Sequence, residues 1–246
     1  MKILVCVTKT PETTAKIAFA NGGTEFDKNG VQFIMNPYDE WYALVRALEL
    51  KEAQGGEVII VNVGDKSNDA IIRKGLAIGA DKAVRIDAKD HSSLSVAKEI
   101  ADYAKNENFD MIFLGKESID YNSASVGAML AELLDLPFIS YASHLSMDGN
   151  TATIERDIDG GAEIVQVSTP MVVSAAKGLA EQRIPNMRGI MMAKRKPLQV
   201  IPGTNADGHV SFVSYELPDE KSSVTMVDPE NMDELVRLLH EEAKAI

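Results

Sequence analysis

Short apolar runs alternate with amphipathic segments of helical length through most of this 246-residue chain. In the segment that follows Pro37, the residues Trp41, Leu44, Val45 and Leu48 keep the i, i+3, i+4, i+7 spacing of one helix face. Runs typical of strands lie at residues 2–7, 57–63, 83–86, 111–114, 138–145 and 152–175, of which 2–7 and 57–63 are typical of buried strands. Helical patterns lie at 37–54, 68–78, 93–106 and 123–134. This alternation predicts an α/β fold with a mostly parallel sheet and helices on both faces.

Turn and cap residues predict where several of these elements begin and end. Asn36 is predicted to cap the first helix, with Pro37 at its first position, where a missing N–H costs nothing. The 8–35 stretch is predicted to be a loop with a possible hairpin near residues 27–30.

The pattern weakens after Pro197, and we therefore divide the chain into an α/β domain, 1–196, and a C-terminal part, 197–246. Residues 197–227 are predicted to form an extended arm with a short strand near 210–215. A last helix is predicted to start at Asp228-Pro229. The arm and the helix either fold back on their own domain or reach across to another subunit.

Composition narrows the class of protein. The net charge of −12 argues against nucleic acid as the main partner, because phosphate binding needs a broad basic surface. No run of 18 apolar residues exists, so we expect no membrane span. The single cysteine, Cys6, and an N-terminus typical of a strand rather than a signal peptide lead us to expect a cytoplasmic protein. The histidines His91, His144, His209 and His240 are scattered, without metal-ligand spacing.

A polar loop after the 111–114 strand carries the clearest signal for a ligand. The chain has neither the GxGxxG fingerprint nor the GxxxxGK[ST] phosphate loop. Residues 121–127, however, read Tyr-Asn-Ser-Ala-Ser-Val-Gly as they enter a helix. Free backbone N–H groups at such a helix start bind phosphate. Ordinary capping of that helix by Asn122 or Ser123 is the alternative.

A second signal is the concentration of positive charge between residues 183 and 196. This segment has no acidic residue, and several methionines and isoleucines accompany its charges, which indicates a surface that contacts an acidic partner. Its basic residues are Arg183, Arg188, Lys194, Arg195 and Lys196. Between 155 and 163, by contrast, the carboxylates Asp157, Asp159 and Glu163 flank a Gly-Gly turn, a pattern more typical of a solvated hairpin than of a catalytic or cation site.

These segments together resemble the electron transfer flavoprotein beta-subunit family. The family has an E-R-x-x-D-G-G-x-E element, a Pro-x-Val-Val strand and an I-M-x-A-K-K-K run, in that order. The matching residues are Glu155, Arg156, Asp159, Gly160, Gly161 and Glu163, then Pro170, Val172 and Val173, then Ile190, Met191, Ala193 and Lys194. The resemblance implies a Rossmann-type fold of the adenine-nucleotide-hydrolase-like kind.

The resemblance also implies a partner, cofactors and sites. An alpha subunit would complete a heterodimer and hold most of the redox FAD, while this chain would hold AMP and dock dehydrogenases. Adenylate-contacting positions would be Cys6, Asn36, Pro37, Tyr38, Asp39 and Val63, and the phosphate loop would be Asp120, Tyr121, Asn122, Ser123, Ala124, Ser125, Val126, Gly127, Ala128, Met129, Leu130 and Ala131. The docking segment, 180–196, would use Met187 as an apolar anchor, with Arg183, Arg188, Ile190 and Lys194 around it.

Two other functions stay open. Electron-bifurcating members of that family place a second FAD in the AMP site and take electrons from NADH, with a Gly-Asp-Thr-Ala-Gln-Val-Gly loop. Only Ala124, Val126 and Gly127 match that loop here, so AMP is favoured. A nucleotide-binding module of the universal-stress type, without redox work, would form a homodimer and would leave residues 154–196 unexplained. No pairing of residues typical of a hydrolytic centre is visible, so we expect no such centre. The resemblance implies a carrier subunit rather than an enzyme.

Overall fold

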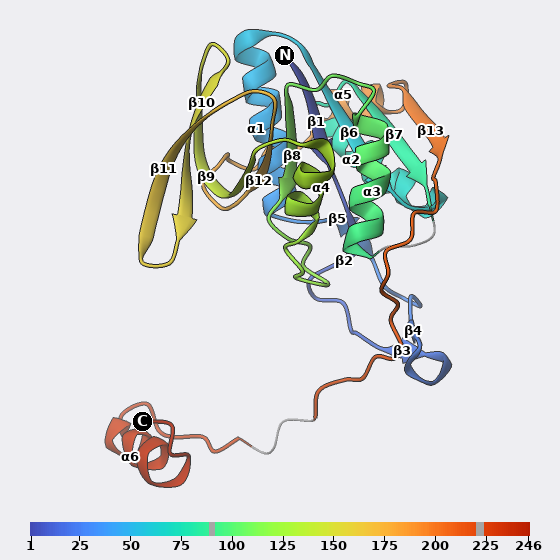
Figure 1. Ribbon diagram of the computed structural model, residues 1–246. Coiled ribbons are helices and arrows are strands. Elements are labelled where there is room, and N and C mark those ends of the chain that lie inside the picture. Colours follow the sequence, from blue (N-terminus) through green and yellow to red (C-terminus); the bar gives the residue numbers. More distant parts are fainter. Residues whose placement is uncertain (89–91, 220–223) are drawn as a thin grey trace. The chain divides into compact units, whose positions relative to one another are not determined.

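The computed structural model describes residues 1–88, 92–219 and 224–246 (Figure 1). These residues form two compact units. The larger comprises Met1–Ile17 and Asp27–Val213, and the smaller comprises Ala18–Phe26 and Ser214–Ile246. His91, one of the four histidines considered above, lies outside the described residues.

In the described residues, the larger unit is built on a nine-stranded sheet with the order β11-β10-β9-β12-β8-β1-β6-β7-β13. All neighbouring strands run parallel except β10, which is antiparallel to both β9 and β11. The strands are β1 (Lys2–Cys6), β6 (Glu57–Val63), β7 (Lys82–Asp87), β8 (Met111–Gly115), β9 (Phe138–Asp148), β10 (Thr151–Ile158), β11 (Gly161–Ser168), β12 (Met171–Ala175) and β13 (Leu198–Pro202). The predicted α/β class with a mostly parallel sheet is confirmed.

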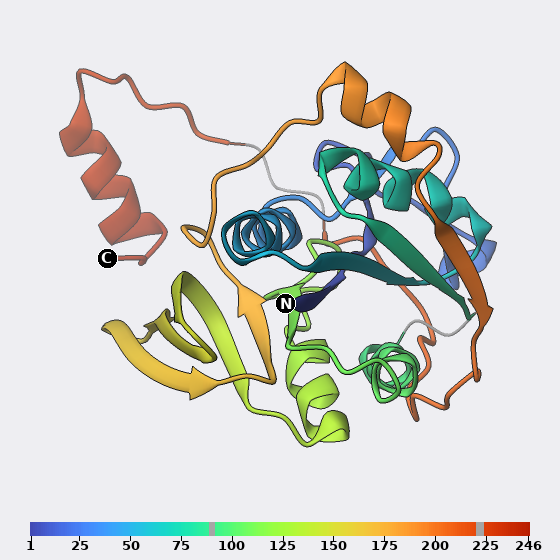
Figure 2. The same cartoon turned by 90° about the horizontal axis from the view of Figure 1, so that it is seen from above.

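Helices cover both faces of this sheet, as Figure 2 shows. Side chains of β1 alternate between the faces, so Ile3 and Val5 pack with α1 (Asp39–Gln54) and α2 (Asp69–Ile78). Leu4 and Cys6 face α3 (Ser93–Ala104) and α4 (Val126–Leu134). The period-two alternation of a strand therefore divides the core into two apolar layers.

The start of α1 differs from the prediction. Asn36 does not cap this helix, which begins at Asp39 after Tyr38, a residue with a φ of 63°. The Asn36 side chain is bonded instead to the loop after β8. The cap prediction was wrong because the Asn36 side-chain amide is bonded to Glu117 and Ile119, which are distant in the sequence.

The residues after Pro197 begin with a strand rather than an arm. β13 lies beside β7 at the edge of the sheet, while the strand predicted near 210–215 does not form. Beyond β13, the buried carboxylate of Glu99 accepts hydrogen bonds from Thr204 and from the Ala206 amide, at 2.9 and 3.0 Å. Near the N-terminus, β2 (Lys9–Pro11) and β5 (Phe33–Met35) pair as a separate, short antiparallel sheet.

The smaller unit contains a hairpin and the C-terminal helix. The hairpin pairs β3 (Phe19–Ala20) with β4 (Glu25–Phe26) around Asn21–Gly23, not around 27–30 as predicted. Tyr215 stacks on Phe19 with ring centroids 5.2 Å apart. The last helix, α6 (Met232–Arg237), is extended by a π-helical turn, Leu238–Glu242; it begins later than predicted.

Candidate functional site

The direction in which the chain travels through the sheet reverses between β1 and β8. From β1 the chain adds β6 and β7 on one side, and then returns to add β8, β12 and β9 on the other. Ligands of open α/β sheets bind at the carboxyl ends of strands at such a reversal. Cys6 ends β1 and Gly115 ends β8, so these residues mark the edge where a ligand site is expected.

Asn36 ties the ends of these two strands together. Its backbone N–H donates to the Thr8 carbonyl at 2.9 Å, just after β1. Its side-chain Nδ2 donates to the Glu117 carbonyl at 2.9 Å, and its Oδ1 accepts from the Ile119 amide at 3.0 Å, both after β8. Asn36 is fully buried. A residue predicted to contact a nucleotide thus holds the loop that leads to α4.

Other predicted contact residues lie at the same edge of the sheet. Burial, with the nearby Glu40 charge, raises the pKa of the Cys6 thiol. Val63 ends β6. Its neighbour Asn62 donates from its side chain to the Val7 carbonyl at 2.8 Å, just after β1. Burial raises the pKa of Asp39 to about 6, partly offset by Lys116. The fold therefore brings the residues before α1 and the ends of β1 and β6 together.

The loop predicted to bind phosphate is exposed, and the helix after it begins at Val126. Neither residue proposed as an ordinary cap acts as one. The Asn122 backbone N–H donates to the Ser118 carbonyl at 2.9 Å, and the Ser123 hydroxyl lies 3.1 Å from the Ser93 hydroxyl. Ser125 precedes the helix without a side-chain capping hydrogen bond. The N–H groups of the first turn of α4 thus receive no capping side chain from this loop.

The rest of the predicted phosphate loop divides between surface and core. Tyr121 is 52% exposed, and its ring lies 5.2 Å from that of Phe212. Leu130 and Ala131 are buried in the apolar layer beneath α3 and α4. Gly127 packs so closely that a Cβ there would lie 2.8 Å from the Phe138 ring. These last residues fix α4 on the sheet.

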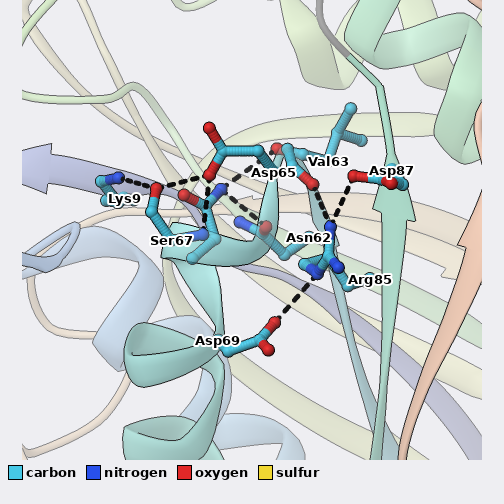
Figure 3. Close-up of polar contacts among 10 residues, drawn as sticks. Lys9, Asn62, Val63, Asp65, Ser67, Asp69, Arg85 and Asp87 are labelled. Atoms are coloured by element: carbon cyan, nitrogen blue, oxygen red, sulfur yellow. Dashed lines mark hydrogen bonds and ion pairs between the residues drawn. The ribbon is translucent and has the colours of Figure 1, made fainter.

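Two buried charges at this edge were missed by the sequence analysis. The Arg85 guanidinium donates to Asp69, Asp87 and the Gly64 carbonyl at 2.9, 2.7 and 2.8 Å, which fixes the turn after β6 (Figure 3). Glu40 accepts from the Thr8 amide at 2.6 Å. An arginine inside an apolar strand was the available signal for the first. The sequence carried no comparable signal for the second.

The basic segment forms a loop and the short helix α5 (Met187–Ala193), which packs against α2. Its Asn186 side chain caps the helix by accepting from the Gly189 amide at 2.8 Å. Large apolar side chains here face outward. Met187 is 74% exposed, Ile184 83% and Met191 67%. The predicted apolar anchor is therefore at the surface.

Two of the five basic residues in this segment are engaged within the fold. Arg183 forms an ion pair with Glu52 at 2.6 Å. Lys196 lies at the carboxyl end of α2 and donates to carbonyl oxygens there, while Arg73 of α2 donates to the Ala193 and Lys196 carbonyls at 2.7 and 2.6 Å. The remaining exposed cations are Arg188, Lys194 and Arg195.

A hollow of about 390 Å³ lies between this segment and the end of α2, with Ile184 and Met192 in its lining. Another, of about 210 Å³, is lined by residues such as Phe109 and Pro170. The 155–163 segment forms the β10–β11 hairpin, where Arg156 lies 3.4 Å from Glu163. In the described residues, no three His, Cys, Asp or Glu side chains are grouped as metal ligands. Nor does that part of the chain contain a helix long and apolar enough to span a membrane.

Comparisons with known proteins agree on one family. The family model described as "Electron transfer flavoprotein domain" matches residues 24–206. "Electron transfer flavoprotein subunit beta" of Bacillus subtilis is 35% identical, and the alignment covers 100% of both chains. The protein of the same name from Syntrophomonas wolfei is 36% identical over 94% of this chain and 91% of its own. That of Homo sapiens is 33% identical over 98% and 97%.

Proposed function

The chain belongs to the electron transfer flavoprotein family, as a beta subunit, and on this premise we propose that it pairs with an alpha subunit in an FAD-containing electron carrier. The complex accepts electrons from dehydrogenases and passes them to a further acceptor. Electron uptake and release would be chemistry supplied by the flavin, whose position and surroundings the protein sets. As the family resemblance implies, we assign most of the flavin contacts to the alpha subunit, and the absence of a dinucleotide fingerprint from this chain is consistent with that assignment.

The role proposed for this subunit at the carboxyl edge of its sheet is to hold AMP. The observation that supports this most strongly is the convergence of three segments there. Asn36 joins the end of β1 to the loop after β8, and that loop leads into α4 without a capping side chain. Backbone N–H groups at the start of α4 would hold the phosphate. Cys6 and Val63 would lie along the nucleoside, since they end neighbouring parallel strands.

The second role is docking. Met187 and Ile184 expose apolar surface beside the cations Arg188 and Lys194. An acidic partner surface with an apolar pocket fits this arrangement, because burying one such side chain contributes roughly 1.5–3 kcal/mol. Opposite charges on the two proteins would also raise the rate at which they associate.

The C-terminal part is proposed to contact the alpha subunit. Helix α6 has no buried residue, and its apolar face leaves Met232 48% and Val236 54% exposed. An amphipathic helix of this kind is stabilised by a surface that covers its apolar face. Removing residues 228–246 is therefore expected to reduce the yield of the two-subunit complex.

Co-expression with an alpha subunit tests the proposal as a whole. We expect a yellow one-to-one complex in which the flavin is reduced by an acyl-CoA dehydrogenase and its substrate. A colourless, stable homodimer that binds AMP would contradict the carrier function and favour the nucleotide-binding module. Reduction by NADH with two flavins per complex would favour the bifurcating form.

A further inference from the structure

Glu40 occupies a position that the nucleotide contacts alone do not explain. It is the second residue of α1, yet it is only 4% exposed. One carboxylate oxygen, Oε2, accepts from the Thr8 amide at 2.6 Å, in the turn after β1. A buried carboxylate is retained at a large desolvation cost unless donors surround it. The hydrogen bond that Glu40 accepts therefore offsets part of the cost of burying its carboxylate.

The contacts of Glu40 begin in the segment between β1 and α1. The Thr8 amide donates to Glu40, and the Thr8 carbonyl in turn accepts from the Asn36 backbone N–H at 2.9 Å. The Asn36 side-chain amide holds the carbonyl of Glu117 and the N–H of Ile119. Hydrogen bonds therefore connect Glu40 to Thr8, Thr8 to Asn36, and Asn36 to the loop before α4.

The packing at the end of β8 leaves little freedom for this carboxylate. A Cβ at Gly115 would lie 2.9 Å from the Glu40 Cγ and 3.0 Å from its backbone nitrogen. Since real side chains do not approach so closely, a glycine at this position lets the start of α1 rest directly on β8. The Glu40 side chain is thereby held by packing as well as by its hydrogen bonds.

We propose that Glu40 is a positioning residue for the adenylate site, which fixes the Thr8 turn directly and the 117–119 loop through Asn36. The proposal rests on the function proposed above, because it concerns the same edge of the sheet. The ionisable groups that interact with this carboxylate are Cys6 of β1 and Asp120 after β8, while Asp39, beside it on α1, interacts with Lys116 and Glu117. Nothing in the role requires Glu40 to touch the nucleotide.

Amide hydrogen exchange of the full chain without ligand tests the positioning role directly. In Glu40→Ala, peptides that cover Thr8 and residues 117–119 should exchange at least tenfold faster, while β12 stays protected. Glu40→Gln keeps one acceptor and should remain within about threefold of wild type. Glu49→Gln, on the same helix, should change neither peptide. Wild-type exchange in Glu40→Ala, or equal losses in the Gln and Ala variants, would overturn the proposal.

A second variant separates the two arms and covers the case in which Glu40→Ala fails to fold. Asn36→Ala removes the contacts to Glu117 and Ile119 but leaves the Thr8 amide on Glu40. Exchange should then rise at 117–119 and stay slow at Thr8. Slow exchange at 117–119 in this variant would contradict the role of Asn36 as the link.

The affinity of the two-subunit complex for AMP connects this role to function. Glu40→Ala should weaken AMP binding at least tenfold, and Glu40→Gln should recover most of the affinity. Unchanged affinity in Glu40→Ala would overturn the functional part of the inference. If wild-type complex binds no AMP, the proposed function fails, whereas the exchange experiment still decides what Glu40 holds in place.

Discussion

The Lys196 ammonium donates a hydrogen bond to the Ala80 carbonyl at 2.5 Å, where the chain leaves α2. The carbonyls of Leu76 and Gly79 accept from the same group at 3.0 and 3.3 Å. The last carbonyls of a helix lack partners within it, and a cation there also meets the negative end of the helix dipole. Although Lys196 belongs to the basic segment, its contacts are those of a structural residue.

Lys196→Gln is therefore expected to lower the free energy of unfolding by about 2 kcal/mol, because several carbonyls lose a charged donor. Chemical denaturation of the full chain measures this. Lys194→Gln is the matched control, since that side chain is exposed and should change stability by less than about 0.5 kcal/mol. Equal effects of the two substitutions would show that Lys196 is not a helix cap.

Met187→Ala is expected to slow electron delivery from an acyl-CoA dehydrogenase by roughly tenfold or more, since an exposed apolar anchor is lost. Flavin content should stay unchanged, which separates docking from assembly. Ile164→Ala on β11 removes a similarly exposed side chain, 70% against 74%, and should leave the rate as it is. A wild-type rate in Met187→Ala would exclude this residue as the anchor.

Gly127→Ala should destabilise the protein by about 1–3 kcal/mol, because the new Cβ would lie 2.8 Å from the Phe138 ring and 3.0 Å from Leu114. Displacement of α4 should also weaken AMP binding. Gly161→Ala is the control, since a Cβ there meets no atom within 4 Å. Thermal unfolding and AMP titration of both variants give the comparison, and equal stability would contradict the close packing of α4.

The pH dependence of stability should report the burial of Glu40. Burial raises the pKa of this carboxyl from 4.5 to about 8 in the folded state, while hydrogen bonds from Thr8 and Asn36 lower it and Asp120 raises it. Between these values the folded state binds more protons than the unfolded state, so stability falls as pH rises. The difference in unfolding free energy between wild type and Glu40→Gln should therefore decrease from about pH 5 to 8, by at most about 1.4 kcal/mol per pH unit. Denaturation at several pH values measures it, and a constant difference would mean that Glu40 ionises normally.

Much of the fold was predictable because the signals are local. Buried strands such as β1 and β6 are short apolar runs, and α1 shows its apolar stripe over about two turns. β13 was missed because its five residues end in a proline and carry no alternation, so only pairing with β7 defines it. The predicted strand at 210–215 has apolar residues but gains no neighbour in the sheet.

The site was predictable only in part, for a physical reason. Residues before α1 and after β8 were placed by resemblance, whereas their linkage through Asn36 depends on a contact across more than 80 residues. The same holds for the partners of Glu40 and Arg85, although the position of Arg85 in an apolar strand is itself a signal of burial. Glu40 accepts from the Thr8 amide, and Arg85 donates to the Gly64 carbonyl and the Asp69 carboxylate, groups that only the folded sheet brings near.

Counting the cofactors released from the purified two-subunit complex tests the central claim most directly. After co-expression with an alpha subunit, denaturation and chromatography should yield one FAD and one AMP per pair of subunits. Two FAD and no AMP, or one FAD and no AMP, would contradict the proposal that this chain holds AMP where β1 and β8 end.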